Sequence, residues 1–484
     1  MNGQEGTCMH TSFSHIRDRL IIAVITLRFI MGGIDSSILP LGISSIAWDF
    51  GGDYASFLFL IEGVIFASAL IFSGRLGDQV GLKQVFLAGV LLFTAGSLVS
   101  AFAPGIEWLM IVKAFSSLGL TISLAVSVPI LMVFIRKEHQ GRAIGYTVMG
   151  TSIGTIIGPV ICGLILQSFG WRSMYFLLLP FGLIILIAGI YSIPQGPCRT
   201  IRISYDLPGF FLIFLTLGVF CIGMNLGLIE QNPLIFAQGL IITILAGAGF
   251  ILWERRAEEP LLDLSFVFQK KVIIPLIIAF SIYAVYRISN YFIPIYLSEI
   301  QKIPPVMIGL ITSIGAVIPA IISPLCGIYI ERKGIFGTVQ LIILSAVSGI
   351  LSSLCMIIIP WTGWLCGVYI SLFFLGLMFA LGWTAAYSYY YAHITLDKAG
   401  VAGGIFETIA ELAGLLSISM VQISFAAGVL ISTGGTISAR DIIWESIPGV
   451  QTIYLVSLLV CILILLLGMN AKRRNRTGLD QNGV

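Results

Sequence analysis

Six charged side chains interrupt long apolar stretches of this sequence. They are Asp35, Glu62, Glu407, Glu411, Lys113 and Arg287. A charged group in apolar surroundings is costly, so it is retained where it binds a partner, a proton or a charged ligand. Two cations cannot neutralise four acids. These positions therefore predict a site that takes up protons or binds a charged substrate.

Glu407 and Glu411 form a pair of their own. They are four residues apart, which places them on one face of a helix with Cβ atoms about 5–6 Å apart. Two negative charges at that range, in poorly solvated surroundings, favour protonation of at least one carboxyl. The pair is a candidate proton-coupling site.

The elements that carry these charges must be membrane-spanning helices. The 484 residues are 58% hydrophobic and 10% charged, and the mean hydropathy is +1.03. A soluble chain of this length carries about 25% charged residues. Apolar runs of about 20 residues indicate helices, since barrel strands alternate over about 10 residues. The polar N-terminus does not look like a removable signal peptide.

Fourteen apolar segments are predicted to span the bilayer. They cover residues 20–43, 54–73, 85–103, 107–134, 143–166, 173–194, 207–228, 234–253, 272–297, 306–330, 337–359, 364–391, 400–430 and 450–470. With the N-terminus in the cytoplasm, the inner loops and tails hold twenty basic residues and the outer loops only Arg172, Lys302 and Arg440. This asymmetry predicts that both termini are cytoplasmic.

The buried charges are expected at similar depths. Counting from the outer ends of their spans at 1.5 Å per residue, Asp35 and Glu62 lie about 12 Å deep, Lys113 about 9 Å and Arg287 about 15 Å. Ion pairs among them are therefore possible, and permanent neutralisation is the structural alternative. Arg28, near the inner end of the first span, is expected to reach back to the cytoplasmic surface.

Two groups of aromatic residues accompany the charges. Tyr283, Tyr286, Tyr291 and Phe292 surround Arg287 and Asn290. They are candidates for a cavity wall that offers ring faces to flat cations. A second group, Tyr387, Tyr389, Tyr390 and Tyr391, is expected to form a belt at the cytoplasmic interface.

An internal repeat divides the chain. GRLGDQVGLK (74–83) and GIYIERKG (327–334) share a glycine, three residues, an acid, two residues and a glycine, at an offset of 253. Two six-span halves in parallel orientation are therefore expected around an insertion of two spans. The predicted parts are a cytoplasmic tail (1–19), an N-terminal six-helix bundle (20–200), two inserted helices (201–256), a C-terminal six-helix bundle (257–470) and a basic tail (471–484).

Glycines recur along the fifth predicted span, in GYTVMGTSIGTIIGPVICG (145–163). They predict a seam without side chains against which a neighbouring backbone packs closely. Pro159 adds a kink, which is tolerated in a membrane where protein or a water-filled cavity satisfies the freed carbonyl.

These motifs resemble those of the major facilitator superfamily. The first loop is similar to its signature at Gly74, Leu76, Asp78, Gly81 and Lys83 and departs from it at Gln79 and Leu82. The resemblance implies a cytoplasmic latch centred on Asp78, with Glu331 and Arg332 in the second copy. The fifth span resembles the antiporter motif at Gly145, Gly154, Gly158, Pro159 and Gly163, with Cys162 replacing one glycine.

The resemblance is most specific to the fourteen-span drug:proton antiporter family. IDSSILPLGISSIAWDF (34–50), YDLPG (205–209) and WERRAEEPLLDLSFVFQ (253–269) carry it. In the fourth span the family has an arginine followed by a glutamine-glycine pair, whereas this chain has Lys113 followed by Phe115, Ser116 and Ser117. The resemblance implies an all-α membrane fold and proton-driven multidrug efflux by alternating access.

Other functions remain open at this stage. Arg287 and Lys113 are anchors for an anionic or zwitterionic metabolite or lipid in an alternative exporter. A membrane-embedded enzyme or a non-transporting sensor is a remote alternative, because no metal-ligand cluster, nucleophile elbow or phosphate loop is evident. We expect no cofactor, no nucleic-acid partner, a monomer, and a location in the plasma membrane.

Overall fold

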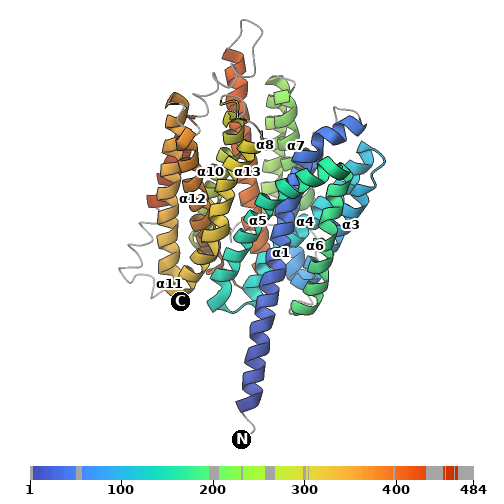
Figure 1. The fold of residues 1–484 in the computed structure, drawn as a ribbon, viewed down its shortest axis with the longest axis vertical. Helices are drawn as coiled ribbons and strands as arrows, with labels where there is room; N and C mark the ends of the chain where they lie inside the picture. Colours follow the sequence, from blue (N-terminus) through green and yellow to red (C-terminus); the bar gives the residue numbers. More distant parts are fainter. Residues whose placement is uncertain are drawn as a thin grey trace. The chain divides into compact units, whose positions relative to one another are not determined.

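The chain folds into long α-helices (Figure 1). The computed structural model describes residues 4–50, 57–195, 206–229, 233–256, 267–297, 301–303, 305–362, 365–395, 398–431, 451–452, 454–462 and 464–466. The helices are α1 (Gln4–Phe50), α2 (Phe57–Val80), α3 (Leu82–Ala101), α4 (Ile106–Phe134), α5 (Lys137–Phe169), α6 (Trp171–Ser192), α7 (Leu207–Ile229), α8 (Pro233–Glu254), α10 (Lys270–Ile295), α11 (Pro305–Thr362), α12 (Leu365–Tyr391) and α13 (Ala399–Ile431).

The prediction of an all-α membrane protein is confirmed. Within the described residues, ten helices are long and apolar enough to cross a membrane. Helices suit such sequences because they satisfy every backbone polar group internally, which hydrocarbon requires. The predicted spans 306–330 and 337–359 both lie in α11, which is interrupted at Gly334 by a non-helical conformation (φ 59°, ψ −145°).

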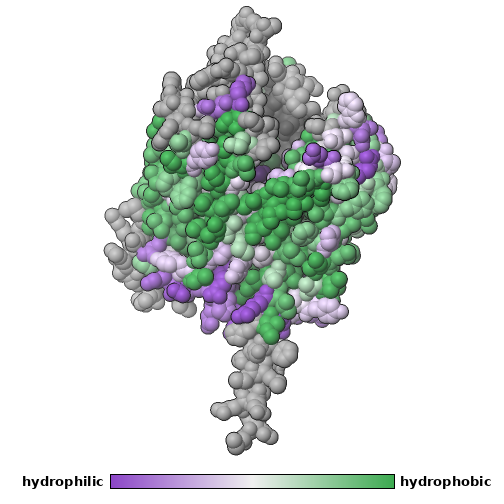
Figure 2. All heavy atoms as spheres, in the orientation of Figure 1, coloured by the Kyte–Doolittle hydropathy of each residue, from purple (hydrophilic) through white to green (hydrophobic). Residues whose placement is uncertain are grey.

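The helices group into two compact units. Unit 1 comprises Met1–Phe214, Phe250–Asp263 and Ile394–Thr408, and unit 2 comprises Leu215–Gly249, Leu264–His393 and Ile409–Val484. In unit 1, α1 packs against α5 and α6, α2 against α4, and α3 against α4 and α6. In unit 2, α12 packs against α10 and α11. On the face shown in Figure 2, hydrophobic residues cover the middle of α5 and hydrophilic residues gather towards its ends.

Glycines of α5 allow its close packing against α1. A Cβ on Gly150 would lie 2.7 Å from the carbonyl oxygen of Thr26, and one on Gly158 would lie 2.6 Å from Ser37 Oγ. Gly154 lies directly against Gly33, so that the two backbones touch. The seam therefore fixes the position of α1, the helix that carries Asp35.

The two copies of the internal repeat end on glycines with unusual backbone angles. Gly81 has a φ of 116° between α2 and α3, and Gly334 has a φ of 59° within α11. Residues other than glycine rarely adopt such angles. The repeat thus places a glycine with a positive φ at a break in helical structure in both units.

Two stretches that carry the family resemblance meet in space. Asp206 accepts a hydrogen bond from the Gly209 amide (2.9 Å) at the start of α7 and one from Trp253 Nε1 (2.8 Å) at the end of α8. The carboxylate caps α7 and also joins it to α8. Farther along these helices, Gly223 and Gly239 meet with a Cβ-to-Cα clearance of 2.8 Å.

Candidate functional site

Three of the predicted charged residues meet inside unit 1. Lys113 on α4 lies with its Nζ 3.3 Å from Asp35 Oδ1 on α1 and 3.5 Å from Glu62 Oε1 on α2. We name this cluster the Lys113 centre. Its members come from three different helices, so the packing of unit 1 brings them together.

The Lys113 centre contains more acids than cations. Two carboxyls share one ammonium, so the cluster carries a net charge of −1 when all three groups are ionised. Lys113 and Asp35 have side chains 1% and 2% exposed, whereas that of Glu62 is 24% exposed. Lys113 Nζ also donates to Asp35 Oδ2 at 3.4 Å. Asp35 is therefore the more deeply buried partner of Lys113, and Glu62 is the more accessible of the two carboxyls.

Tyr175 on α6 borders this centre and was not identified from the sequence. Its side chain is 1% exposed, and Lys113 Nζ lies 6.0 Å from the centre of its ring. Within the described residues its hydroxyl has no hydrogen-bond partner. A buried, unpaired hydroxyl beside an ion cluster is a polar group that a bound water or ligand can satisfy. A single tyrosine in an apolar span carries no signal that separates it from a packing residue.

The prediction for Arg28 is wrong. Its side chain does not extend to the cytoplasmic surface but is buried, with 3% exposed. Nε donates to Ser123 Oγ (3.1 Å) and one terminal nitrogen to the Leu120 carbonyl (2.5 Å). Both acceptors lie on α4, so Arg28 joins α1 to the helix that carries Lys113.

A second charged group lies in unit 2. The guanidinium of Arg287 on α10 sits 5.7 Å from the ring centre of Tyr283, and Tyr283 donates from its hydroxyl to Glu411 Oε1 on α13 (3.1 Å). We name Arg287, Tyr283 and Glu411 the Arg287 centre. A Cβ on Gly414 would lie 3.0 Å from Arg287 Nε, so this glycine leaves space for the guanidinium. Within the described residues, Nε has no hydrogen-bond partner.

The other predicted residues of this region differ in their surroundings. Glu407 lies one turn before Glu411 on α13 and is 9% exposed. Asn290 donates to the Tyr286 carbonyl of its own helix (2.8 Å). Phe292, proposed for a cavity wall, is 1% exposed and packs against Tyr296 and Tyr454. For Phe292 the prediction is wrong, because it lies on the buried face of α10.

The tyrosines at the end of α12 do not form an interfacial belt. Tyr387, Tyr390 and Tyr391 are 2%, 0% and 8% exposed, so their rings face the protein interior. The ring of Tyr387 stacks on that of Tyr391 with a centre distance of 5.8 Å, and it meets the Trp383 ring edge-on with a centre distance of 5.7 Å. The belt prediction failed because the sequence pattern of tyrosines at a helix end is the same whether their rings face lipid or protein.

An aromatic column was missed in the sequence. The rings of Phe379 and Trp383 stack with their centres 5.5 Å apart, and the ring of Tyr286 stacks on that of Phe379 with a centre distance of 4.2 Å. Trp383 also lies 5.3 Å from Tyr283 of the Arg287 centre. The signal was present, because Phe379, Trp383, Tyr387 and Tyr391 recur every four residues, which places them on one face of a helix.

Asp78 lies against the start of α13. Its two carboxylate oxygens accept hydrogen bonds from the amides of Gly400 (2.7 Å) and Val401 (2.8 Å). Free amides and the helix dipole favour a negative charge at this position. Gly74 lies directly against the backbone of Gly400, so a side chain on either glycine would displace the contact.

The remaining residues of the predicted latch are spread over both units. Lys83 donates from Nζ to the Ile190 carbonyl near the end of α6 (2.6 Å). In unit 2, Glu331 is partly buried and Arg332 is exposed, both just before the kink at Gly334.

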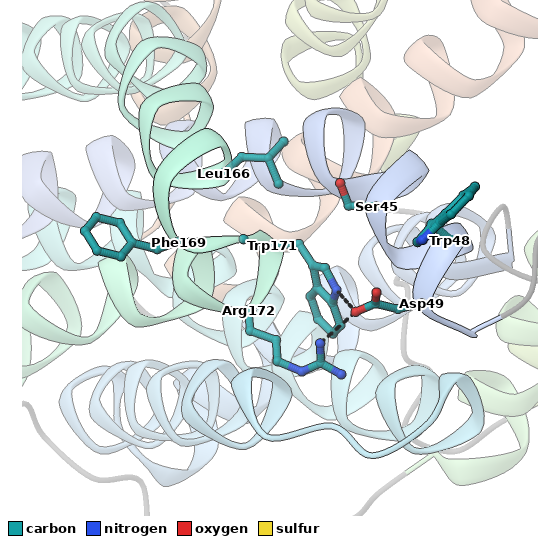
Figure 3. A pocket seen from close by; sticks show the side chains of 8 residues that line it. Ser45, Trp48, Asp49, Leu166, Phe169, Trp171 and Arg172 are labelled. Atoms are coloured by element: carbon teal, nitrogen blue, oxygen red, sulfur yellow. Dashed lines mark hydrogen bonds and ion pairs between the residues drawn. The ribbon is translucent and has the colours of Figure 1, made fainter.

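A pocket of about 450 Å³ lies where α1 ends beside the turn from α5 to α6 (Figure 3). Asp49 accepts hydrogen bonds there from Trp171 Nε1 (2.9 Å) and from Arg172 (2.8 Å). Both hydrogen bonds lower the pKa of the Asp49 carboxyl, and the bond from Trp171 has the larger effect. In the same pocket, Trp48 is 90% exposed. This ion pair holds the far end of the helix that carries Asp35.

Comparison with known proteins shows which family the chain resembles. Residues 24–418 match the family model described as Major Facilitator Superfamily. The chain is 26% identical to the riboflavin transporter RibZ of Clostridioides difficile over 319 residues, covering 65% of this chain and 68% of RibZ. It is 26% identical to the tetracenomycin C resistance and export protein of Streptomyces glaucescens over 438 residues, covering 87% and 78%.

The fold also resembles that of a solved transporter. The proton:xylose symporter XylE superposes with a TM-score of 0.64 at 15% identity, covering 93% of this chain and 96% of XylE. At this identity the likeness concerns the fold alone.

Proposed function

The chain belongs to the major facilitator superfamily, and we propose that it is a proton-coupled antiporter that exports lipophilic, cationic compounds. That it is a multi-pass membrane transporter and not an enzyme follows from the family. The drug:proton exchange is our proposal. It assigns the chain to the fourteen-span subfamily of multidrug efflux proteins, and the export and resistance role printed for the Streptomyces relative supports it.

The charge imbalance of the Lys113 centre is the observation that carries the proposal. One ammonium cannot neutralise both Asp35 and Glu62. The surplus negative charge is costly in a poorly solvated interior unless a proton or a cation compensates it. Proton and cationic cargo would therefore compete for the same carboxyl.

The cycle we propose uses this competition. With the site open to the cytoplasm, Glu62 gives up its proton and the carboxylate attracts a cationic cargo. With the site open to the outside, protonation of Glu62 releases the cargo. A ligand shifts such an equilibrium only through its different affinity for the two states, and the shared carboxyl supplies that difference.

Other residues have supporting roles in this proposal. Asp35 holds Lys113 in place, Glu407 and Glu411 supply a second proton-binding pair, and Tyr283, Tyr286 and Asn290 line the cargo path. Asp78 at the α13 amides (2.7 and 2.8 Å) would act as the cytoplasmic latch.

The proposal includes a membrane topology. Both termini lie in the cytoplasm and the protein resides in the plasma membrane, as the distribution of basic residues favours. Residues 20–200 and 257–470 form the two six-helix bundles, with 201–256 as the inserted pair. We also propose that the protein acts as a monomer.

Export of an anionic or zwitterionic compound is the second candidate. The Arg287 guanidinium has no carboxylate within 4.0 Å among the described residues and holds only a ring contact to Tyr283. Such a group binds carboxylates and phosphates through paired hydrogen bonds. Lys113 is a poorer anchor than the sequence suggested, because two carboxylates already occupy it.

Reconstitution into liposomes tests the proposal. The full chain is placed in vesicles with an imposed pH gradient, and lumenal pH is followed while a lipophilic cation such as tetraphenylphosphonium is added. We expect the cation to evoke proton movement that is lost in Glu62→Gln and in Asp35→Asn. The control Glu107→Gln removes an exposed acid at the start of α4 and should leave the signal unchanged.

The outcomes separate the candidates. Proton movement evoked by an aromatic carboxylate but not by the cation, and abolished by Arg287→Gln, would favour the second candidate. Exchange at the parental rate in both Glu62→Gln and Asp35→Asn would show that coupling does not depend on the Lys113 centre. Binding of solutes without any flux would instead favour a sensor.

A further inference from the structure

The guanidinium of Arg287 on α10 lacks a hydrogen-bonding partner in the part of the chain that the structure describes. No described residue forms a hydrogen bond or an ion pair with it, and its Nε is fully buried. The ring of Tyr283, with its centre 5.7 Å away, is its cation–π partner. An unpaired charged group in a poorly solvated interior is costly. A bound ligand with acceptor oxygens would remove this cost.

Glu411 on α13 lies in the same centre but is held by another group. Its Oε1 accepts a hydrogen bond from the Tyr283 hydroxyl (3.1 Å), and it forms no ion pair with Arg287. A Cβ on Gly414 of the same helix would lie 3.0 Å from Arg287 Nε, so the glycine leaves space beside the guanidinium. The N–H groups of Arg287 therefore stay open to an acceptor on another molecule.

One face of α10 carries the groups that would surround such an acceptor. They recur at intervals of three or four residues and are all partly buried: Tyr283, Tyr286, Arg287 and Asn290. This spacing places them on one face of the helix. Their partners lie on α12, where Phe379 stacks on Tyr286, and on α13. The face therefore points into unit 2.

Tyr286 offers an aromatic surface next to the guanidinium. It directly precedes Arg287 in the chain, and Phe379 covers one face of its ring with the ring centres 4.2 Å apart. Among the described residues, its other face has no aromatic partner. Aromatic rings bind one another by offset or edge contacts at centre distances of about 4.5–7 Å. A cation and an open ring face thus lie next to each other on α10.

From this arrangement we infer that the Arg287 centre binds a planar aromatic carboxylate. The carboxylate accepts paired hydrogen bonds from the guanidinium, and the ring lies on the open face of Tyr286. The inference gives the second candidate function a chemical class of substrate, and it rests on that candidate for transport but not for binding. A lipophilic cation, the cargo proposed for the Lys113 centre, would be repelled by Arg287.

Isothermal titration calorimetry of the detergent-solubilised full chain tests the inference. Naphthoate is the ligand, and two analogues each lack one feature: naphthylmethanol has no charge, and cyclohexanecarboxylate has no flat ring. We expect naphthoate to bind about tenfold more tightly than naphthylmethanol, because the charged hydrogen bonds are lost in the alcohol. It should bind about fivefold more tightly than cyclohexanecarboxylate, which cannot stack. Equal binding of naphthoate and either analogue would overturn the inference.

Variants assign the two features to their residues. Arg287→Gln should lower the affinity for naphthoate about tenfold or more. Arg287→Lys keeps the charge but loses the planar fork, and should fall between that variant and the parent. Tyr286→Leu should weaken naphthoate about fivefold and leave cyclohexanecarboxylate unchanged. The control Lys271→Gln removes an exposed cation from the same helix and should bind naphthoate as the parent does.

Three results would contradict this assignment. They are parental affinity in Arg287→Gln, an equal loss for both acids in Tyr286→Leu, and a loss in the control Lys271→Gln. Melting temperatures confirm that the variants fold.

Glu411→Gln gives a result that misfolding does not produce. The amide oxygen can still accept from Tyr283, while a negative charge near the ligand is removed. We expect naphthoate to bind about threefold or more tightly in this variant, because like charges repel. Unchanged or weaker binding would contradict the placement of the carboxylate at Arg287.

Glu62→Gln separates this inference from the proposed cation exchange. It should abolish proton release evoked by tetraphenylphosphonium and leave naphthoate binding unchanged, since Glu62 belongs to the Lys113 centre. Naphthoate binding by a parent protein that shows no cation-evoked proton release would support the inference and refute the cation exchange. Cation-evoked release without naphthoate binding would refute the inference alone. Loss of naphthoate binding in Glu62→Gln would also overturn it.

Discussion

Asp35 and Lys113 form an ion pair of 3.3 Å in the interior of unit 1, with 2% and 1% of their side chains exposed. Glu62 lies 3.5 Å from the same ammonium but is 24% exposed. The Asp35–Lys113 pair is thus buried, whereas the Glu62 carboxyl is partly accessible. This asymmetry distinguishes two acids that the sequence presents as equivalent.

Removing the ammonium should destabilise the protein strongly. Lys113→Met leaves the buried Asp35 without its partner, and breaking a buried ion pair in this way costs about 3–5 kcal/mol. The double variant Lys113→Met/Asp35→Asn removes both charges and should recover much of that loss. Thermal unfolding in detergent measures both. If the double variant were no more stable than the single one, Asp35 would not be the group that requires Lys113.

The glycine seam should tolerate an added methyl group at Gly163 but not at Gly154. Gly154→Ala places a Cβ 2.9 Å from the Cα of Gly33 and even closer to the Ile30 carbonyl, whereas a Cβ on Gly163 meets no described atom within 4 Å. Overpacking of this kind costs about 1–3 kcal/mol. We expect a lower melting temperature and slower transport for Gly154→Ala, with Gly163→Ala as the matched control. Equal effects of the two substitutions would argue against backbone contact at Gly154.

Hydrogen exchange should detect the contact made by Asp78. Its carboxylate accepts from the amides of Gly400 and Val401, and hydrogen bonds to charged groups contribute about 1.5–3 kcal/mol. In Asp78→Ala these two amides should exchange about tenfold faster or more. Glu138→Gln, at an exposed acid in the first turn of α5, is the control. Unchanged protection in Asp78→Ala would mean that the α13 amides are held by other groups.

The Asp49 contact should make a pH-dependent contribution to stability. Hydrogen bonds from Trp171 and then Arg172 lower the pKa of this carboxyl below its ordinary value of 3.8. A group whose folded pKa is lowered stabilises the protein fully above its unfolded pKa, and the contribution disappears as the pH falls through the folded pKa. Asp49→Asn should therefore melt below the parent protein at pH 7, and the difference should shrink below about pH 3.8. A difference independent of pH would show that charge is not involved.

Some of this organisation could be predicted from the sequence. The acids and cations stood out because apolar spans exclude charge, and the repeat located two breaks in helical structure that both use glycine with a positive φ. The depth count placed Asp35, Glu62 and Lys113 at similar levels. These features depend on local sequence or on distance along a helix.

The rest depends on how each helix is rotated about its axis, which a depth count does not contain. Arg28 was expected near the membrane surface, yet it faces α4 and bonds to Ser123. Tyr390 is at a helix end but faces inward with 0% exposed. Tyr175 and Trp383 acquire their importance only from neighbours on other helices. The spacing of Phe379, Trp383, Tyr387 and Tyr391 was the one overlooked pattern that the sequence did contain.

Proton release on cargo binding is the measurement that tests the exchange at Glu62 most directly. Detergent-solubilised protein in weakly buffered solution near pH 7 is mixed with tetraphenylphosphonium, and the pH is recorded. We predict release of up to about one proton per chain, because the two-acid, one-cation centre has a single surplus charge to share. Glu62→Gln should abolish the release, and Glu107→Gln should retain it. Cation binding without proton release, or the same release in Glu62→Gln, would contradict the account.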